Sequence, residues 1–455
     1  MVVVKQAEQT ETWSGIVQKV ESQLSELKSI ATQVSTHSND LLRLKKAHNF
    51  LLLLGRLDMN SADAPDTDIL RQSIIVHDSD VLLKDGHLDD IPVFQEELNT
   101  FKAFKTKITT NGLEWLEQGL EQGNQTLLSK GIQIFVNLHT LSRVVCDLME
   151  KYQKEMADLC KYTFDLSSLN AEMTELKKSG NLGSRSIPLV AFAGILWSRT
   201  EKLADSIYTH TSKINSLEVF LSRKNDSASR VFLLQYVKSE MKGLMNEDEG
   251  LKSYFWRILC ENLDIQLKAA TKSANFLLQV LQAGYPKLLR IFSDLFGRIK
   301  LSTGQEEFGH VLINTTLKPF ETAYISRSLT RLLETVSQIV HKGTPNREDA
   351  QKLARTISSE LNAVKFNSDL LDLVCQNVVR ALGNFRQKID LMVAHDTVFS
   401  ITSSTPSTVQ LQKIDIINCL YSLSESIWAL LQDYDGSVIE GSIVDATEVL
   451  SIYSL

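Results

Sequence analysis

Histidines that lie close to acidic side chains are the first candidates for catalysis or metal binding. The nine histidines of this sequence occur singly, and His87 is followed within three residues by two carboxylates, Asp89 and Asp90. Such a group could ligate a metal ion or act as a general base. The segment is short and polar and is followed by Pro92, so we interpret it as a solvated loop.

Known catalytic motifs are absent from the sequence. It contains no HExxH zinc signature, no CxxC pair, no GxxxxGK[ST] or GxGxxG phosphate loop and no GxSxG nucleophile motif. The five cysteines are spread among apolar residues, which is typical of buried, reduced thiols. We therefore predict a protein that is not an enzyme, with no catalytic residue, no cofactor and no metal site.

Basic side chains form one pattern that could bind an anion. Arg327 and Arg331 are one helical turn apart, and Lys318 precedes them on the same predicted helix. Cations at this spacing can bind a phosphate or an acidic partner. These three residues are therefore candidates for such a contact, and the alternative interpretation is an ordinary solvated face.

The candidate cations must be positioned by helices, because the apolar residues around them recur with helical spacing. In residues 284–299 and 317–340, apolar side chains follow one another at intervals of three and four, which is typical of amphipathic helices with one buried face. Pro286 and Pro319 fit the first turns of these helices, where no backbone donor is lost.

Short polar features are expected to interrupt or begin other helices. Asn111 and Gly112 lie in an otherwise helical stretch, where we expect a kink or a break. Asn346 or Asp349 is expected to cap the helix that follows the loop at residues 341–349. The remaining pattern is helical nearly throughout. We therefore predict an all-α protein, an elongated stack of antiparallel helical bundles with a coiled-coil-like helix at its N-terminus.

That N-terminal helix carries its own pattern, in which apolar positions alternate at intervals of four and three. The apolar positions are Trp13, Val17, Val20, Leu24, Leu27, Ala31, Val34 and Leu41, and the polar Ser38 occupies the position between the last two. The residues between them are largely polar, and such a narrow stripe suits a coiled-coil partner. Two interpretations are open: the helix docks onto another chain, or it folds back onto this one.

Polar linkers suggest a division into four segments. We predict an assembly helix over residues 1–58, a first helical bundle over 59–180, a central helical bundle over 181–345 and C-terminal helices over 346–455. The net charge of −7 argues against general nucleic-acid binding. The most apolar run, residues 187–197, is shorter than the roughly 20 residues of a membrane span, so membrane contact is expected to be peripheral and indirect.

Several stretches also resemble one protein family, both in amino-acid sequence and in their order along the chain. They are WLEQGLEQGNQTLLSKGIQIFVNLHTL (115–141), FWRILCENLDIQLKAATKSANFLLQ (255–279), GYPKLLRIFSDLFGRI (284–299), LKPFETAYISRSLTRLLETVSQIV (317–340) and ISSELNAVKFNSDL (357–370). Together they resemble the fifth-subunit family of the conserved oligomeric Golgi complex, which consists of helical-rod vesicle tethers. The resemblance runs from about residue 41 to the end of the chain.

The resemblance implies a tethering subunit that acts in retrograde vesicle transport within the Golgi and thereby maintains the glycosylation enzymes there. It implies a location in the cytosol and on the cytosolic face of Golgi membranes. It also implies direct pairing with the seventh subunit, with the sixth and eighth in the same lobe, and contacts with SNAREs and small GTPases. Family members are longer at both ends, so residues 346–455 are expected to be incomplete. The alternative is a subunit of another tethering complex or a general helical scaffold.

Overall fold

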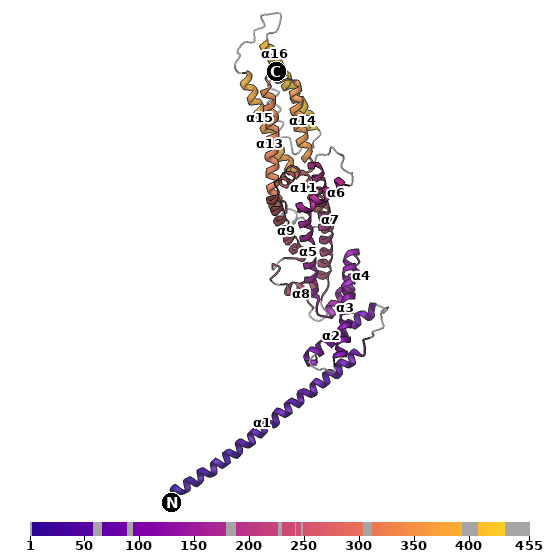
Figure 1. Cartoon of the computed structure of the whole chain (residues 1–455), viewed down its shortest axis with the longest axis vertical. Coiled ribbons are helices and arrows are strands. Elements are labelled where there is room, and N and C mark those ends of the chain that lie inside the picture. Colours follow the sequence, from indigo (N-terminus) through magenta and orange to yellow (C-terminus); the bar gives the residue numbers. More distant parts are fainter. Residues whose placement is uncertain are drawn as a thin grey trace. The chain divides into compact units, whose positions relative to one another are not determined.

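The computed structural model describes most of the chain as helices (Figure 1). The described residues are 2–57, 66–88, 94–178, 188–225, 230–241, 243–246, 249–303, 312–393 and 408–432. Within these ranges no β-sheet is formed, and an isolated bridge joins Asn225 to Phe232. The predicted all-α class is confirmed.

The described ranges form a series of helices. They are α1 (Val2–Leu54), α2 (Asp66–Gly86), α3 (Gln95–Gln122), α4 (Gln125–Asn137), α5 (Leu141–Phe164), α6 (Leu166–Lys178), α7 (Pro188–Arg223), α8 (Leu233–Glu240), α9 (Leu251–Ser273), α10 (Asn275–Ala283), α11 (Tyr285–Thr303), the π-helical turn η3 (Ile313–Leu317), α13 (Lys318–His341), α14 (Arg347–Val364), α15 (Ser368–Val393) and α16 (Thr408–Gln432).

The start of α14 shows how local sequence sets a helix boundary. Asn346 Oδ1 accepts hydrogen bonds from the backbone N–H groups of Glu348 (2.9 Å) and Asp349 (3.1 Å). Asp349 Oδ2 in turn accepts from the N–H of Asn346 (3.3 Å), which completes a capping box. The predicted cap is confirmed, and both candidate residues take part in it.

The chain divides into two compact units. Unit 1 comprises Met1–Glu150 and Ser216–Asp248, and unit 2 comprises Lys151–Asn215 and Glu249–Leu455. In unit 1, α3 packs extensively on α4, and α2 lies against α1, α3 and α4. In unit 2, α13 packs on α14 and α15, and α14 packs on α16. The four-segment division proposed from the linkers stays a prediction.

Glycines allow α3 and α4 to approach each other closely. A Cβ atom added at Gly119 of α3 would lie 2.6 Å from the backbone nitrogen of Leu128 in α4. A Cβ atom at Gly131 of α4 would lie 2.8 Å from the backbone nitrogen of Leu116 in α3. Both distances are too short for real carbon atoms, so the contact between the two helices depends on glycine at these positions.

The expected kink or break at Asn111 and Gly112 is wrong, because α3 continues through both residues. A Cβ atom at Gly112 would lie 3.0 Å from Phe135 Cζ and 3.1 Å from Ile134 Cγ2. Phe135 is completely buried. Glycine in a helix costs roughly 1 kcal/mol relative to alanine, and here the packing of α4 against the exposed backbone offsets that cost.

The two proline-led amphipathic helices are confirmed as α11 and α13, which lie in contact in unit 2. Pro286 and Pro319 each occupy the second position of their helix. The predicted faces are buried: in α11 they include Leu289, Phe292 and Ile299, and in α13 Phe320, Tyr324, Leu332, Val336 and Ile339. Burial of such faces, rather than helix propensity alone, holds helices of this length in place.

Candidate assembly surface

The side chains of the predicted apolar stripe of α1 are all exposed to water. Among the described residues nothing covers it, and its seven large side chains have exposed fractions from 50% to 68%. These seven are Trp13, Val17, Val20, Leu24, Leu27, Val34 and Leu41, and Ala31 between them is exposed as well. This arrangement favours docking onto another chain over folding back onto this one.

The apolar surface of α1 is wider than the stripe that was predicted from the spacing of four and three. Ile16 and Ile30 each precede a stripe residue, Val17 and Ala31, and both isoleucines are about half exposed. They add a third apolar position in two heptads along one flank of the helix, whereas Gln23 and His37 occupy the equivalent positions of the other two. Three positions per heptad are typical of helices in bundles, whereas two positions are typical of a two-stranded coiled coil.

The polar side of α1 satisfies its own hydrogen-bonding groups. The hydroxyl of Ser25 donates to the carbonyl of Ser22 at 2.7 Å, and that of Thr32 donates to the carbonyl of Ser29 at the same distance. Such bonds leave the hydroxyl groups with no need of a partner.

The C-terminal end of α1 is fixed to unit 1. Phe50 is completely buried and packs edge-to-face against Phe101 of α3, with ring centroids 5.6 Å apart. Arg43 donates to the carbonyls of Gly86 and His87, at 3.2 and 3.0 Å, and Lys46 donates to a neighbouring carbonyl at 2.9 Å. These carbonyls at the end of α2 lack helical partners, so basic side chains stabilise them and tie the two helices together.

The three candidate cations of α13 already have partners within the chain. Lys318 Nζ lies 2.6 Å from Glu321 Oε1, and Arg331 donates to both carboxylate oxygens of Glu360 at 2.6 and 2.8 Å. Arg327 donates a long bond of 3.4 Å to the carbonyl of Gln279. A phosphate or acidic partner would have to compete with Glu321 and Glu360, and the predicted contact remains untested.

The ion pair of Arg331 continues into the core of unit 2. Glu360 is 7% exposed, and its second oxygen also accepts from the buried hydroxyl of Ser328 at 2.7 Å. Burial and the nearby Glu360 carboxylate raise the pKa of Tyr324 to about 12. Ser328 lies between Arg327 and Arg331 in the sequence, but the carboxylate of Glu360, 32 residues further along the chain, could not be assigned from spacing.

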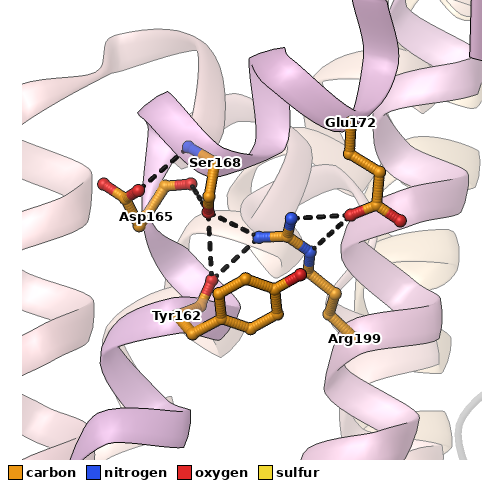
Figure 2. Close-up of polar contacts among 5 residues, drawn as sticks. All are labelled: Tyr162, Asp165, Ser168, Glu172 and Arg199. Carbon is orange, nitrogen blue, oxygen red and sulfur yellow. Dashed lines mark hydrogen bonds and ion pairs between the residues drawn. The ribbon is translucent and has the colours of Figure 1, made fainter. Parts of the chain in front are cut away.

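A second buried polar cluster was missed in the sequence, and it is shown in Figure 2. Arg199 of α7 is 5% exposed and donates to one oxygen of Glu172 at 2.6 and 2.9 Å. It also donates to the carbonyl of Tyr162 and to the hydroxyl of Ser168, both at 2.8 Å. The N–H of Ser168 donates to Asp165, which lowers the pKa of that carboxyl group.

This cluster is structural, because its groups are used within the chain. The guanidinium group lies 4.0 Å from the centroid of the Tyr162 ring and holds the turn between α5 and α6 against α7. The spacing of Asp165 and Ser168 is that of a helix cap, which was the one local signal available. The links to Arg199 join residues 27 or more positions apart, and sequence spacing gives no indication of them.

The described residues offer no metal centre and no membrane span. They contain no group of three or more histidine, cysteine, aspartate or glutamate side chains arranged to hold a metal ion. No helix in the described ranges combines the length and apolar character needed to cross a bilayer. The carbonyl of His87 accepts a bond from Arg43, whereas Asp89 and Asp90 lie outside the described residues.

Comparison with known proteins gives one consistent family. A family model described as "Conserved oligomeric Golgi complex subunit 5, C-terminal" matches residues 88–296, and curated relatives of that name align with nearly the whole chain. The chain is similar to the subunit 5 family over nearly its whole length. The matched range begins beyond α1 and ends within α11.

The curated relatives of the subunit 5 family are distant in sequence. The mouse protein is 22% identical and aligns with 98% of this chain and 60% of its own length. The Arabidopsis thaliana protein is 25% identical and aligns with 95% of this chain and 51% of its own length. The Drosophila melanogaster protein is 24% identical and aligns with 88% of this chain and 51% of its own length. The chain thus spans about half to three fifths of the relatives it matches. No solved structure matches it significantly.

Proposed function

We propose that this chain is a non-enzymatic subunit of the conserved oligomeric Golgi complex. It would act on the cytosolic face of Golgi membranes, where it would help to tether vesicles of retrograde transport within the Golgi. In this way it would help to retain glycosylation enzymes. Similarity to the subunit 5 family supports the assignment to the complex. The exposed apolar stripe of α1 supports this mode of action, because it suits a protein that functions by binding other chains.

The stripe can supply a substantial part of a binding energy. Covering a half-exposed aliphatic side chain contributes about 1 kcal/mol, so its seven large side chains contribute roughly 7 kcal/mol. The loss of translational and rotational freedom on association costs of the order of 4 to 15 kcal/mol. The free energy gained by covering this one narrow stripe is therefore close to the cost of association. Ile16 and Ile30 widen the surface, and we infer that the stripe is covered by more than one helix in the assembled complex.

The partners follow from the family. We infer direct pairing with the seventh subunit, with the sixth and eighth subunits in the same lobe, and further contacts with SNAREs or small GTPases. The net charge of −7 does not favour nucleic acid as a partner. The cations Lys318, Arg327 and Arg331 remain candidates for an acidic or phosphorylated partner.

Paired substitutions on α1 test this proposal. Leu24→Asp with Leu27→Asp places two charges on the stripe, and Ser22→Asp with Ser29→Asp places two charges on exposed positions of the polar side. Each variant is expressed in cells as the full chain, captured by affinity and analysed for stoichiometric partners. The leucine variant should lose at least one obligate subunit, and the serine control should keep all of them, with equal helix content by circular dichroism.

Two results would count against the proposal. Unchanged recovery of subunits with the leucine variant would remove α1 from the assembly surface. Capture of the wild-type chain with an exocyst-type assembly, or with no stoichiometric Golgi subunit, would favour another tethering complex or a general scaffold.

A further inference from the structure

A groove in unit 2 has the size and the charges of a peptide-binding site. It has a volume of about 1130 Å³ and lies between α7, α11, α13 and the C-terminal end of α14. Sites for small ligands usually occupy about 300 to 1,000 Å³, so this groove can hold a segment of several residues. It shares no residue with α1, and its role is independent of the proposed assembly surface.

Three of the four acidic side chains in the groove walls are engaged by cations of the chain. Asp205 of α7 lies 2.7 Å from Arg298, and Glu201 lies 3.8 Å from Lys287. On the opposite side, Glu360 of α14 is bound by Arg331 through two hydrogen bonds. These pairs fix the walls and largely cancel the charges that face each other there.

One guanidinium group in the groove remains available. Arg290 is exposed at the middle of α11, and within the described part of the chain no carboxylate forms an ion pair with it. A guanidinium group presents paired N–H donors that match a carboxylate in two-bond geometry. Asp294, one turn further along, is also exposed and repels a second acid, so the groove favours a single carboxylate at Arg290.

The same groove is also lined by an apolar surface, on the segment that ends α14. Phe366 is 41% exposed, and Ala363 one turn before it is exposed as well. An aromatic ring left in water gains from being covered by an aliphatic side chain. We propose that this groove binds a short segment of another protein, with an acidic side chain at Arg290 and an apolar side chain at Phe366.

Peptide binding to the full chain, followed by fluorescence anisotropy, tests the proposal. The probes are a short fluorescein-labelled peptide of glutamate and leucine and a matching peptide of lysine and leucine. The wild type should bind the glutamate peptide at least ~10-fold more tightly, the effect of a charge contact of about 1.4 kcal/mol. Arg290→Glu should weaken its binding about 10-fold, and Asp294→Lys should strengthen it.

Two further variants separate the groove from general electrostatics. Arg380→Glu makes the same charge change on an exposed position of α15 outside the groove and should leave binding within about twofold of wild type. Phe366→Ala should weaken binding and leave its salt dependence unchanged. Equal affinity for the two peptides, or equal loss in Arg290→Glu and Arg380→Glu, would overturn the proposal. Displacement of the peptide by millimolar inorganic phosphate would also overturn it, in favour of a small-anion site.

Discussion

The contact between α3 and α4 yields the sharpest stability prediction, through the substitution Gly119→Ala. The added Cβ atom would lie 2.6 Å from the nitrogen and 2.9 Å from the Cα atom of Leu128. Both atoms belong to the backbone, so no side-chain rotation can relieve the overlap. The two helices must separate, and the apolar side chains between them, such as Leu128, lose part of their packing.

The size of the effect follows from two opposing contributions. Replacing glycine by alanine within an unobstructed helix stabilises it by roughly 0.5 to 1 kcal/mol. Overpacking a close contact costs typically about 1 to 3 kcal/mol and more where backbone must move. Gly119→Ala should therefore lower the free energy of opening of α3 and α4 by about 2 kcal/mol. Gly383→Ala in α15, where nothing lies within 4 Å of the added atom, should raise local stability by about 0.5 to 1 kcal/mol.

Hydrogen exchange followed by mass spectrometry measures both variants locally. Peptides from α3 and α4 should exchange roughly 30-fold faster in Gly119→Ala, since about 1.4 kcal/mol corresponds to a factor of ten. Peptides from α15 should exchange more slowly in Gly383→Ala. Protection of α3 and α4 that is unchanged or increased in Gly119→Ala would refute the argument that backbone proximity requires glycine there.

Two further predictions concern titration. Burial raises the pKa values of Cys160 and Cys419 from 9.0 to about 12. Alkylation by iodoacetamide near pH 9 should therefore be much slower in the folded chain than in urea, and each thiol should destabilise the fold as pH rises from 9 towards 12. Equal alkylation rates in the folded and unfolded chain would contradict this prediction. Burial, and then the adjacent His139, lower the pKa of His77 below 6.5, so stability should fall as pH drops through and below 6.5. The variant His139→Asn, which tolerates the φ of +52°, should lose less stability in thermal unfolding over that pH range, and an identical loss would contradict the coupling.

Helices such as α11 and α13 could be predicted because their signal is local. Leu289, Phe292 and Ile299 recur at helical spacing, and the chain needs no distant information to fold them onto one face. The same reasoning found the cap at Asn346, whose partners lie two and three residues away. Local periodicity and capping chemistry therefore give both the existence of these helices and which side of each is buried.

The rest could not be predicted because it depends on which helices meet. Gly112 has the local character of a helix breaker, yet the ring of Phe135 from α4 packs over it and the helix continues. Arg331 has the spacing of an anion site, but Glu360 from α14 occupies it. Arg290 carries no distinctive motif, and its place in a groove appears only when residues of α7, α11, α13 and α14 come together.

The exposed stripe of α1 also has an energetic consequence that spacing alone does not give. Its helix is held at one end, where Phe50 is buried and Arg43 binds the end of α2. A helical segment without tertiary contacts is only marginally stable in water. Near Leu41 the anchored backbone is already ordered for a partner, whereas around Trp13 the helix depends on its own hydrogen bonds. Partner helices that cover the stripe therefore contribute stability to α1 itself, and most strongly at the end furthest from Phe50.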